Sequence, residues 1–147
     1  MTIREMKPED FDQVLDMMAV FYASDALLIH PDMTTLKRTL TDAIDAGPYL
    51  EGFAFCDGEE LAGYGMVAKS YSTEVGGRCV WIEDIYIRPE FRGQGLGTAF
   101  LGFVEDRYKG WAVRLRLEAE EENENAMKVY RKAGFEDLGY IQLVKTV

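Results

Sequence analysis

Apolar and polar positions along the chain follow two periods, which predict helices and strands in turn. Apolar residues three and four positions apart indicate amphipathic helices, whereas strict alternation indicates half-buried strands. Gly, Pro and Asp-Gly pairs separate these segments, as helix ends and tight turns require. The expected elements are a strand at 2–6, helices at 8–22 and 34–46, strands at 49–56, 61–68 and 78–88, a helix from the glycines to about 109, a strand at 111–119, a helix at 123–133, and a last strand or hairpin at 135–147.

The segment from Val80 to Ile87 is rich in β-branched apolar residues, which suit a half-buried strand. Its alternation slips by one position at Glu83-Asp84, where two acidic residues stand side by side. One extra residue in a strand produces such a slip, so we predict a β-bulge at this pair. Pro89 has no N–H to donate to a ladder and therefore closes the strand.

The order of these elements predicts an α+β (mixed α/β) fold with a central, mostly antiparallel sheet flanked by about four helices. With 147 residues the chain has the length of one domain, so we expect a single domain over residues 1–147. The two cysteines, Cys56 and Cys79, both lie in apolar strand-like runs. Buried free thiols are therefore expected, with neither a disulfide nor a metal site.

The formal net charge of −10 arises from 26 acidic and 16 basic residues. This balance argues against nucleic acid as a partner, because phosphate binding needs the opposite sign. It is compatible with attraction of a cationic substrate, and equally with plain solubility. No apolar run approaches the ~20 residues of a membrane span, and the start of the chain has no signal-peptide pattern. We expect a cytoplasmic protein without a membrane partner.

Three glycines after the central strand, Gly93, Gly95 and Gly97, precede an apolar helix. Bare N–H groups at a helix N-terminus, together with the helix dipole, form an anion site, and Arg92 adds a positive charge. The spacing fits neither G-x-G-x-x-G nor a P-loop. Glycines kept only for close packing at the helix start are the alternative interpretation.

The pattern Arg92-x-x-Gly95-x-Gly97 resembles the pyrophosphate-binding loop of the GNAT superfamily of acyl-CoA-dependent N-acetyltransferases. The later pattern Asn123-x-x-Ala126-x-x-x-Tyr130-x-x-x-Gly134-Phe135 is similar to the last helix of GNAT enzymes. The element order also matches, so the resemblance covers essentially the whole chain. The Glu83-Asp84 pair is similar to one in polyamine and thialysine acetyltransferases. The resemblance implies a sheet splayed at the central strand, acetyl-CoA as the cofactor and a possible homodimer.

The resemblance also implies where acetyl-CoA binds. Ile85 would donate its backbone N–H to the acetyl oxygen, and Ile87 would pair with the pantetheine arm as an added strand. Asn123 would contact the cofactor or cap its helix. The diphosphate would lie near Arg92, on the backbone N–H groups of Gln94, Gly95, Leu96, Gly97 and Thr98.

Acetyl transfer to an amine requires a base, because an alkylammonium with a pKa near ~10.4 must lose a proton before it attacks. The candidates are Glu83, Glu118 and Asp84, in that order, and a solvated or ion-paired state is expected for Asp84. Tyr130 has helical spacing typical of a core aromatic residue, whereas the resemblance makes it the general acid for the leaving thiolate. Glu120-Glu121-Glu122 is expected to be a solvated strand end.

The leading interpretation is an N-acetyltransferase for a primary amine of a small cationic molecule. The alternatives are acetylation of a protein N-terminus or lysine, which Glu118 keeps open, and a non-catalytic acyl-CoA-binding regulatory module. By position, one wall of the acceptor site would come from four residues between the first two helices, Tyr22, Ser24, Asp25 and His30. The opposite wall would come from Tyr71, Ser72 and Glu74.

Overall fold

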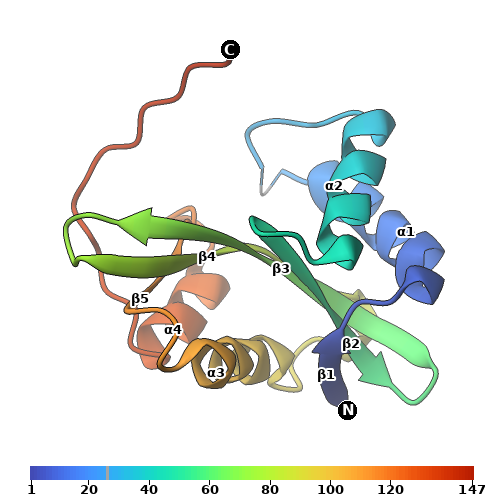
Figure 1. Cartoon of the computed structure of the whole chain (residues 1–147). Helices are drawn as coiled ribbons and strands as arrows, with labels where there is room; N and C mark the ends of the chain where they lie inside the picture. Colours follow the sequence, from blue (N-terminus) through green and yellow to red (C-terminus); the bar gives the residue numbers. More distant parts are fainter. Residues whose placement is uncertain (26) are drawn as a thin grey trace.

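One five-stranded sheet runs through the molecule, which is known from a computed structural model that describes residues 1–25 and 27–147. The strands stand in chain order across the sheet (Figure 1), and all neighbours are antiparallel except the last pair. This agrees with the expected mostly antiparallel α+β architecture. The strands are β1 (Thr2–Glu5), β2 (Leu50–Asp57), β3 (Glu60–Ser72), β4 (Gly77–Ile87) and β5 (Arg114–Leu117).

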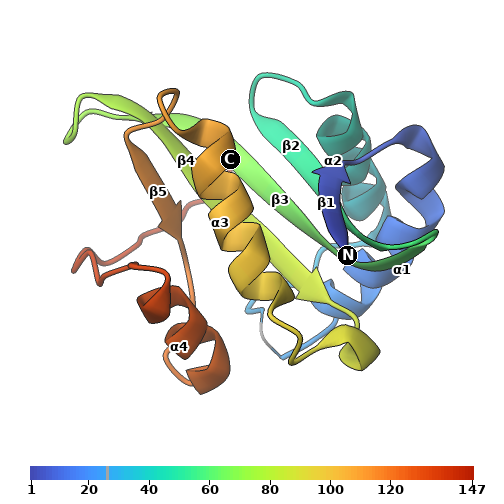
Figure 2. The ribbon, with the colours of Figure 1, turned by 90° about the horizontal axis from the view of Figure 1, so that it is seen from below.

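The described residues form four α-helices that cover the two faces of this sheet in pairs, with α1 and α2 on one face and α3 and α4 on the other (Figure 2). Short 3-10 turns precede α1 and follow β4. None of the helices in the described part of the chain is long and apolar enough to cross a membrane. The bounds are η1 (Pro8–Asp10), α1 (Phe11–Tyr22), α2 (Met33–Asp45), η2 (Pro89–Phe91), α3 (Leu96–Tyr108) and α4 (Glu124–Lys132).

The two faces of the sheet carry separate hydrophobic cores because successive strand residues point to opposite sides. Tyr64, Met66 and Tyr86 pack under α1 and α2. Val80 and Ile82 pack under α3, together with partly buried Ile85 and Ile87. Cys56 and Cys79 are buried free thiols, as expected.

The predicted β-bulge is confirmed at Glu83. Met66 of β3 stands opposite Asp84, and the next residue, Val67, stands opposite Ile82, so Glu83 is the extra residue on β4. This insertion reverses the alternation of side chains along the strand. As a result, Ile82 and Ile85 share the α3 face, whereas Asp84 faces α1. The slip in the sequence pattern is therefore a structural feature of β4.

The pairing of β4 with β5 is parallel and short. It joins Cys79–Ile82 to Arg114–Leu117, and β5 ends there, five residues before β4 ends at Ile87. The predicted strand at 111–119 is thus present but shorter. Beyond the bulge β4 keeps only β3 as its partner among the described strands. The sheet is open on this side of β4, as the expected splay requires.

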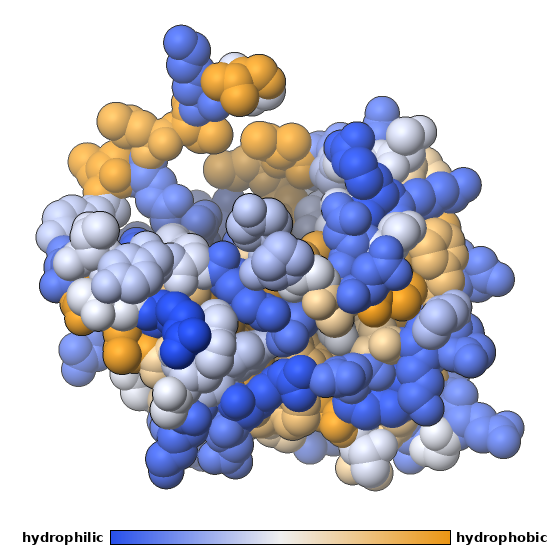
Figure 3. Space-filling view, in the orientation of Figure 1, coloured by the Kyte–Doolittle hydropathy of each residue, from blue (hydrophilic) through white to orange (hydrophobic). Residues whose placement is uncertain are grey.

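The predicted strand or hairpin at 135–147 is wrong in this structure. Residues 136–147 form no strand and run away from the sheet (Figure 1). Exposed hydrophobic side chains gather over this C-terminal segment in Figure 3, and Ile141, Leu143 and Val144 are each at least 89% exposed. The apolar pattern indicated strand preference, but a strand also needs a neighbouring edge, which local sequence does not specify.

Candidate active site

The open edge of β4 presents backbone groups of Ile85 and Ile87. The Arg88 N–H donates to the Ala62 carbonyl of β3 at 2.9 Å. Because backbone groups alternate in direction along a strand, those of Ile85 and Ile87 point to the opposite, open side. In agreement, the Ile87 carbonyl accepts from Arg92 Nε at 2.9 Å instead of from a strand. The N–H groups of both residues can therefore pair with an extended ligand along this edge.

The glycine-rich loop ends at the N-terminus of α3. Gly93 and Gly95 adopt φ angles of 74° and 81°, left-handed values that favour glycine. The Ala99 N–H donates to the Gly95 carbonyl at 2.9 Å and begins the helical bonding. The N–H groups of residues 96–98 precede it at the positive end of the helix, where an anion binds favourably.

Gly97 differs from the other two glycines because the fold does not require it. It has no left-handed φ, and an added Cβ would come no closer than 3.9 Å to its nearest neighbour, Ile87 Cδ1. Glycine at such a position leaves space for a group that lies over the backbone. Arg92 is exposed beside the loop, with its guanidinium 5.8 Å from the Tyr86 ring centroid. These features fit a phosphate-bearing ligand that extends from α3 along β4.

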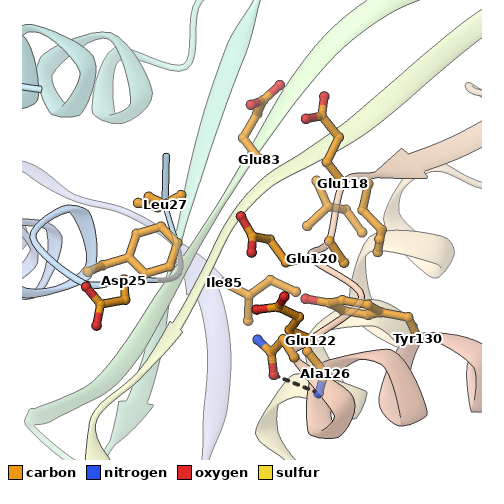
Figure 4. A pocket seen from close by; sticks show the side chains of 14 residues that line it. Asp25, Leu27, Glu83, Ile85, Glu118, Glu120, Glu122, Ala126 and Tyr130 are labelled. Carbon is orange, nitrogen blue, oxygen red and sulfur yellow. Dashed lines mark hydrogen bonds between the residues drawn. The ribbon is translucent and has the colours of Figure 1, made fainter. Parts of the chain in front are cut away.

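A pocket of about 390 Å³ adjoins the same edge of β4 (Figure 4). Five carboxylates and no Lys or Arg side chain stand among the described residues of its wall, so its interior favours positive charge. The loop after α1, the bulge of β4, the chain after β5 and α4 all contribute. The lining residues are Phe21, Asp25, Leu27, Ile82, Glu83, Ile85, Leu117, Glu118, Ala119, Glu120, Glu122, Asn123, Ala126 and Tyr130.

Glu83 is the bulged residue, and its carboxylate shares this pocket with Glu118 (Figure 4). The pocket walls remove water from the carboxylate, which raises the pKa of Glu83, and the charges of Asp84 and Glu118 raise it further. A carboxylate with a raised pKa holds a proton more strongly. It is therefore a better proton acceptor for an ammonium group than an ordinary glutamate.

Tyr130 of α4 lies across the pocket, and its hydroxyl points toward the interior (Figure 4). The ring is half-buried and packs edge-on against Phe135, with centroids 6.4 Å apart. Burial raises the pKa of Tyr130, so its hydroxyl stays protonated at neutral pH. Tyr130 thus combines partial core packing with a proton available to the pocket, and the two interpretations of its spacing are compatible.

Asp84 corrects one expectation, because it is neither solvated nor ion-paired. The residue is 3% exposed, and its carboxylate accepts from the Tyr22 hydroxyl at 2.6 Å and the Tyr64 hydroxyl at 3.1 Å. Burial raises the pKa of Asp84, and the two hydrogen bonds oppose that rise. The sequence could not reveal these partners, because Tyr22 and Tyr64 lie 62 and 20 residues away.

The structure places the predicted site residues in two adjoining groups. Glu83, Ile85, Glu118, Asn123 and Tyr130 meet in the pocket. The Asn123 side chain caps α4 by accepting from the Ala126 N–H at 3.3 Å, which confirms the capping role and leaves the cofactor contact a prediction. The second group lies along the loop and the end of β4 and comprises Ile87, Arg92, Gln94, Gly95, Leu96, Gly97 and Thr98.

Three further acidic residues line the pocket, whereas one predicted wall lies outside it. Glu120 and Glu122 are exposed, as expected for a solvated segment after a strand, and they also line the pocket, which the sequence did not predict. Asp25 lines it as positional analogy suggested. Tyr71, Ser72 and Glu74, the other predicted wall, are not among the lining residues of this pocket, and the Glu74 carboxylate accepts from Arg114 at 2.9 Å and from the Tyr140 hydroxyl at 2.7 Å. The sequence shows acidic residues at 118, 120 and 122, but it does not show the turn after β5 that brings them to the pocket wall.

Among the residues that the structure describes, no group of three or more His, Cys, Asp or Glu side chains is arranged so that it could hold a metal ion. The acidic side chains stand around the cavity instead of converging on one point (Figure 4). Such spacing suits an organic cation that is larger than a metal ion.

Comparison with known proteins gives a family match over most of the chain. The model of a family described as "Acetyltransferase (GNAT) family" matches residues 15–135. The thialysine N-epsilon-acetyltransferase of Bos taurus is 41% identical over 80 residues, which cover 53% of this chain and 46% of that protein. The chain therefore spans about half the length of the curated relatives that it matches.

Solved structures share the fold. A possible acetyltransferase from Clostridium difficile 630 has a TM-score of 0.85 and 20% identity, over 99% of this chain and 97% of that chain. The structure of AAC(6')-Iy in complex with the bisubstrate analog CoA-S-monomethyl-acetylneamine has a TM-score of 0.77 and 19% identity. That alignment covers 99% of this chain and 97% of that chain, and at this identity it supports the fold alone.

Proposed function

The chain belongs to the acetyltransferase (GNAT) family, and from that premise we propose that it transfers the acetyl group of acetyl-CoA to a primary amine of a small cationic molecule. One observation carries the proposal. An acidic pocket, which contains a carboxylate of raised pKa and a tyrosine hydroxyl, opens beside the unpaired edge of β4. The named thialysine acetyltransferases support an amine acceptor.

Glu83 acts as the general base in this proposal, directly or through a water molecule. It takes a proton from the bound ammonium, and the neutral amine nitrogen then attacks the thioester carbonyl carbon. Negative charge develops on the carbonyl oxygen, where the Ile85 N–H can stabilise it. Glu83 is the bulged residue, two positions before Ile85, and both line the pocket. This arrangement supports Glu83 as the base and the Ile85 N–H as the donor to the carbonyl oxygen.

Tyr130 acts as the general acid for the second half of the reaction. When the carbon–sulfur bond breaks, the sulfur leaves with the electron pair and takes the proton of the Tyr130 hydroxyl. The nitrogen of the new amide gives its surplus proton back to the Tyr130 phenolate, and Glu83 releases the proton that it took from the ammonium to solvent. A thiol has a pKa of ~8.5, so the departing sulfur is basic enough to accept a proton, and it leaves more easily when a donor supplies one. The raised pKa of Tyr130 keeps that proton in place until the thiolate forms.

The glycine-rich loop binds the diphosphate of acetyl-CoA in this proposal. Backbone N–H groups of Gln94 to Thr98 and the Arg92 side chain supply the positive potential. The pantetheine arm pairs with Ile87, whose N–H faces the open edge of the sheet. A fold neighbour carries a CoA-derived bisubstrate analog, which makes CoA the first ligand to test.

An amine panel tests the proposed function. Thiol release from acetyl-CoA is followed with spermidine, thialysine, lysine, an aminoglycoside and a peptide with a free N-terminus. We expect turnover with at least one small polycationic amine and a weaker response to the peptide. Turnover restricted to the peptide would instead support the alternative, in which Glu118 acts as the base for a protein N-terminus or lysine.

A non-catalytic acyl-CoA-binding module is the other alternative on the same scaffold. It predicts a thermal shift with acetyl-CoA but no acetylated product from any amine in the panel. The convergence of Glu83 and Tyr130 on one pocket favours the enzyme. A cytoplasmic location and a homodimer remain predictions from the sequence analysis.

A further inference from the structure

A buried hydrogen-bond network connects the pocket bulge to the helix on the far side of the sheet. The Asp84 carboxylate lies between the Tyr22 hydroxyl of α1, at 2.6 Å, and the Tyr64 hydroxyl of β3, at 3.1 Å. The bond from Tyr64 stays within the sheet, between neighbouring strands. The bond from Tyr22 is different because it joins β4 to the last residue of α1.

The Tyr22 end of this network holds one wall of the pocket. Phe21 and Asp25, immediately before and shortly after Tyr22, both line the cavity. The Tyr22 carbonyl also contacts His30 Nδ1 at 2.7 Å, so the chain leaving α1 is tied back to the same residue. At the other end, Asp84 is adjacent to Glu83, which lines the cavity from β4. The Tyr22–Asp84 hydrogen bond is therefore a direct link between the two walls.

Burial of Asp84 is costly, because a carboxylate loses its water and gains only two hydroxyl partners. An apolar residue would fit a packed core at lower cost. A charged group that persists in such a place suggests a function other than stability.

We propose that Asp84 is a positioning residue, which through Tyr22 fixes the end of α1 against the β4 bulge and thereby sets the width of the acceptor pocket. In this proposal Asp84 affects the affinity for the amine and leaves acetyl-CoA binding at the glycine-rich loop unchanged. This inference rests on the proposed acetyl transfer, and it adds a specific determinant of acceptor recognition.

The network has a second, electrostatic consequence. Ionised Asp84 raises the pKa of Glu83, as does Glu118 from the chain after β5. The titratable groups that interact with Asp84 are Tyr22 on α1, Tyr64 on β3 and Glu83 on β4, and Tyr86 of β4 acts on Tyr64. Loss of a hydroxyl donor makes Asp84 harder to ionise, so the pKa of Glu83 should fall. The acid limb of the pH–rate profile should then move to lower pH.

Tyr22→Phe and Tyr64→Phe are a matched pair, because each removes one hydroxyl from the same carboxylate. We expect Tyr22→Phe to raise the KM for spermidine, or for the best amine of the panel, by about fivefold. The KM for acetyl-CoA should not change. Tyr64→Phe should leave the amine KM within about twofold, since its bond does not reach α1. Both variants should shift the acid limb downward by roughly half a unit.

Asp84→Asn separates charge from geometry, because the amide keeps the size and an acceptor for Tyr22. We expect the downward shift of the acid limb with a smaller rise in amine KM. Thermal melts provide the folding control. The folded-state pKa of Asp84 is raised, so ionised Asp84 opposes folding above its unfolded pKa, and the substitution should not lower Tm at pH 7.

Hydrogen exchange tests the link without any substrate. Amides in residues 19–25 should exchange at least about threefold faster in Tyr22→Phe than in the wild type or Tyr64→Phe, because the end of α1 has lost its tie. Unchanged exchange and unchanged amine KM in Tyr22→Phe would overturn the inference even if the wild type acetylates amines. Faster exchange, in a protein that acetylates no amine, would instead reject the proposed function while the structural link stands.

Discussion

The glycine-rich loop and the acceptor pocket adjoin the same strand, yet they recognise opposite charges by different means. The loop relies on left-handed glycines, helix N–H groups and Arg92, all within seven consecutive residues. The pocket takes its carboxylates from three separate parts of the chain, after α1, at the β4 bulge and after β5. The net charge of −10 has the same sign as the pocket but the opposite sign to the loop.

This difference shows how one acidic chain can hold both an anionic cofactor and a cationic acceptor. Backbone N–H groups give the loop a local positive potential without adding many basic residues. The pocket keeps its negative potential because no Lys or Arg stands among its described lining residues. Substitutions in the pocket should therefore alter chemistry and amine binding, and substitutions in the loop should alter acetyl-CoA binding.

Tyr130→Phe should have the largest effect. Removal of the hydroxyl leaves the leaving thiolate without its proton donor, so kcat should fall about 100-fold. Acetyl-CoA affinity, measured by calorimetry, should not change, because the ring keeps its packing against Phe135. Tyr140→Phe is the control, since Tyr140 is exposed and bonded to Glu74 outside the pocket. Equal kinetics for Tyr130→Phe and the wild type would assign Tyr130 to the core alone.

Glu83→Gln should lower kcat/KM about thirtyfold at pH 7 and less at high pH. The base accepts a proton only when ionised, so wild-type activity is lost as pH falls through the raised pKa of Glu83. The variant should lack this limb, and free amine at high pH partly restores its rate. Glu120→Gln removes the same charge from the same pocket and should affect amine KM without changing the limb. A wild-type pH profile from Glu83→Gln would exclude Glu83 as the base.

Arg92→Ala should raise the KM for acetyl-CoA by about fivefold at low salt, and the difference should shrink as salt screens the charges. The amine KM should not respond. Arg88→Ala is the neighbouring control, because Arg88 is paired with Glu60 at 3.3 Å. If the KM for acetyl-CoA stayed constant in Arg92→Ala at every salt concentration, the diphosphate would not lie at this loop.

Gly95→Ala and Gly97→Ala should give the smallest effects. The first should lower the stability of the fold, and the second should weaken acetyl-CoA binding. Gly95 has a φ of 81°, so alanine there should destabilise the fold by about 1 kcal/mol, seen in urea unfolding. Gly97 has neither positive φ nor a close neighbour and lies in α3, so alanine should maintain or slightly raise stability and weaken acetyl-CoA binding about twofold. The reverse pattern would mean that Gly97 is a packing residue and that no ligand approaches it.

Much of the fold and the loop followed from local sequence patterns. Hydrophobic periodicity predicted the four α-helices and five strands of the described residues, but not η2, and the slip at Glu83-Asp84 predicted the bulge that Met66 and Val67 confirm. The glycine spacing and Asn123 indicated the helix start and the α4 cap. The helices, turns and cap could be predicted because their hydrogen bonds are made by residues that are near in sequence. The strands and the bulge could be predicted because the alternation of side chains is a property of the local backbone, even though their hydrogen-bond partners are distant.

The pocket and its supports followed only from the tertiary structure. Three features depend on which distant elements meet in the fold. They are the hydrogen-bond partners of Asp84, the positions of Glu120 and Glu122 in the pocket wall, and the absence of a strand at 135–147. By itself the sequence determined the elements, the bulge and the charge of the loop, because each is a property of a few consecutive residues. Packing alone decided that Tyr22 reaches a buried carboxylate and that five acids surround one cavity, because side-chain contacts across a sheet have no local signature.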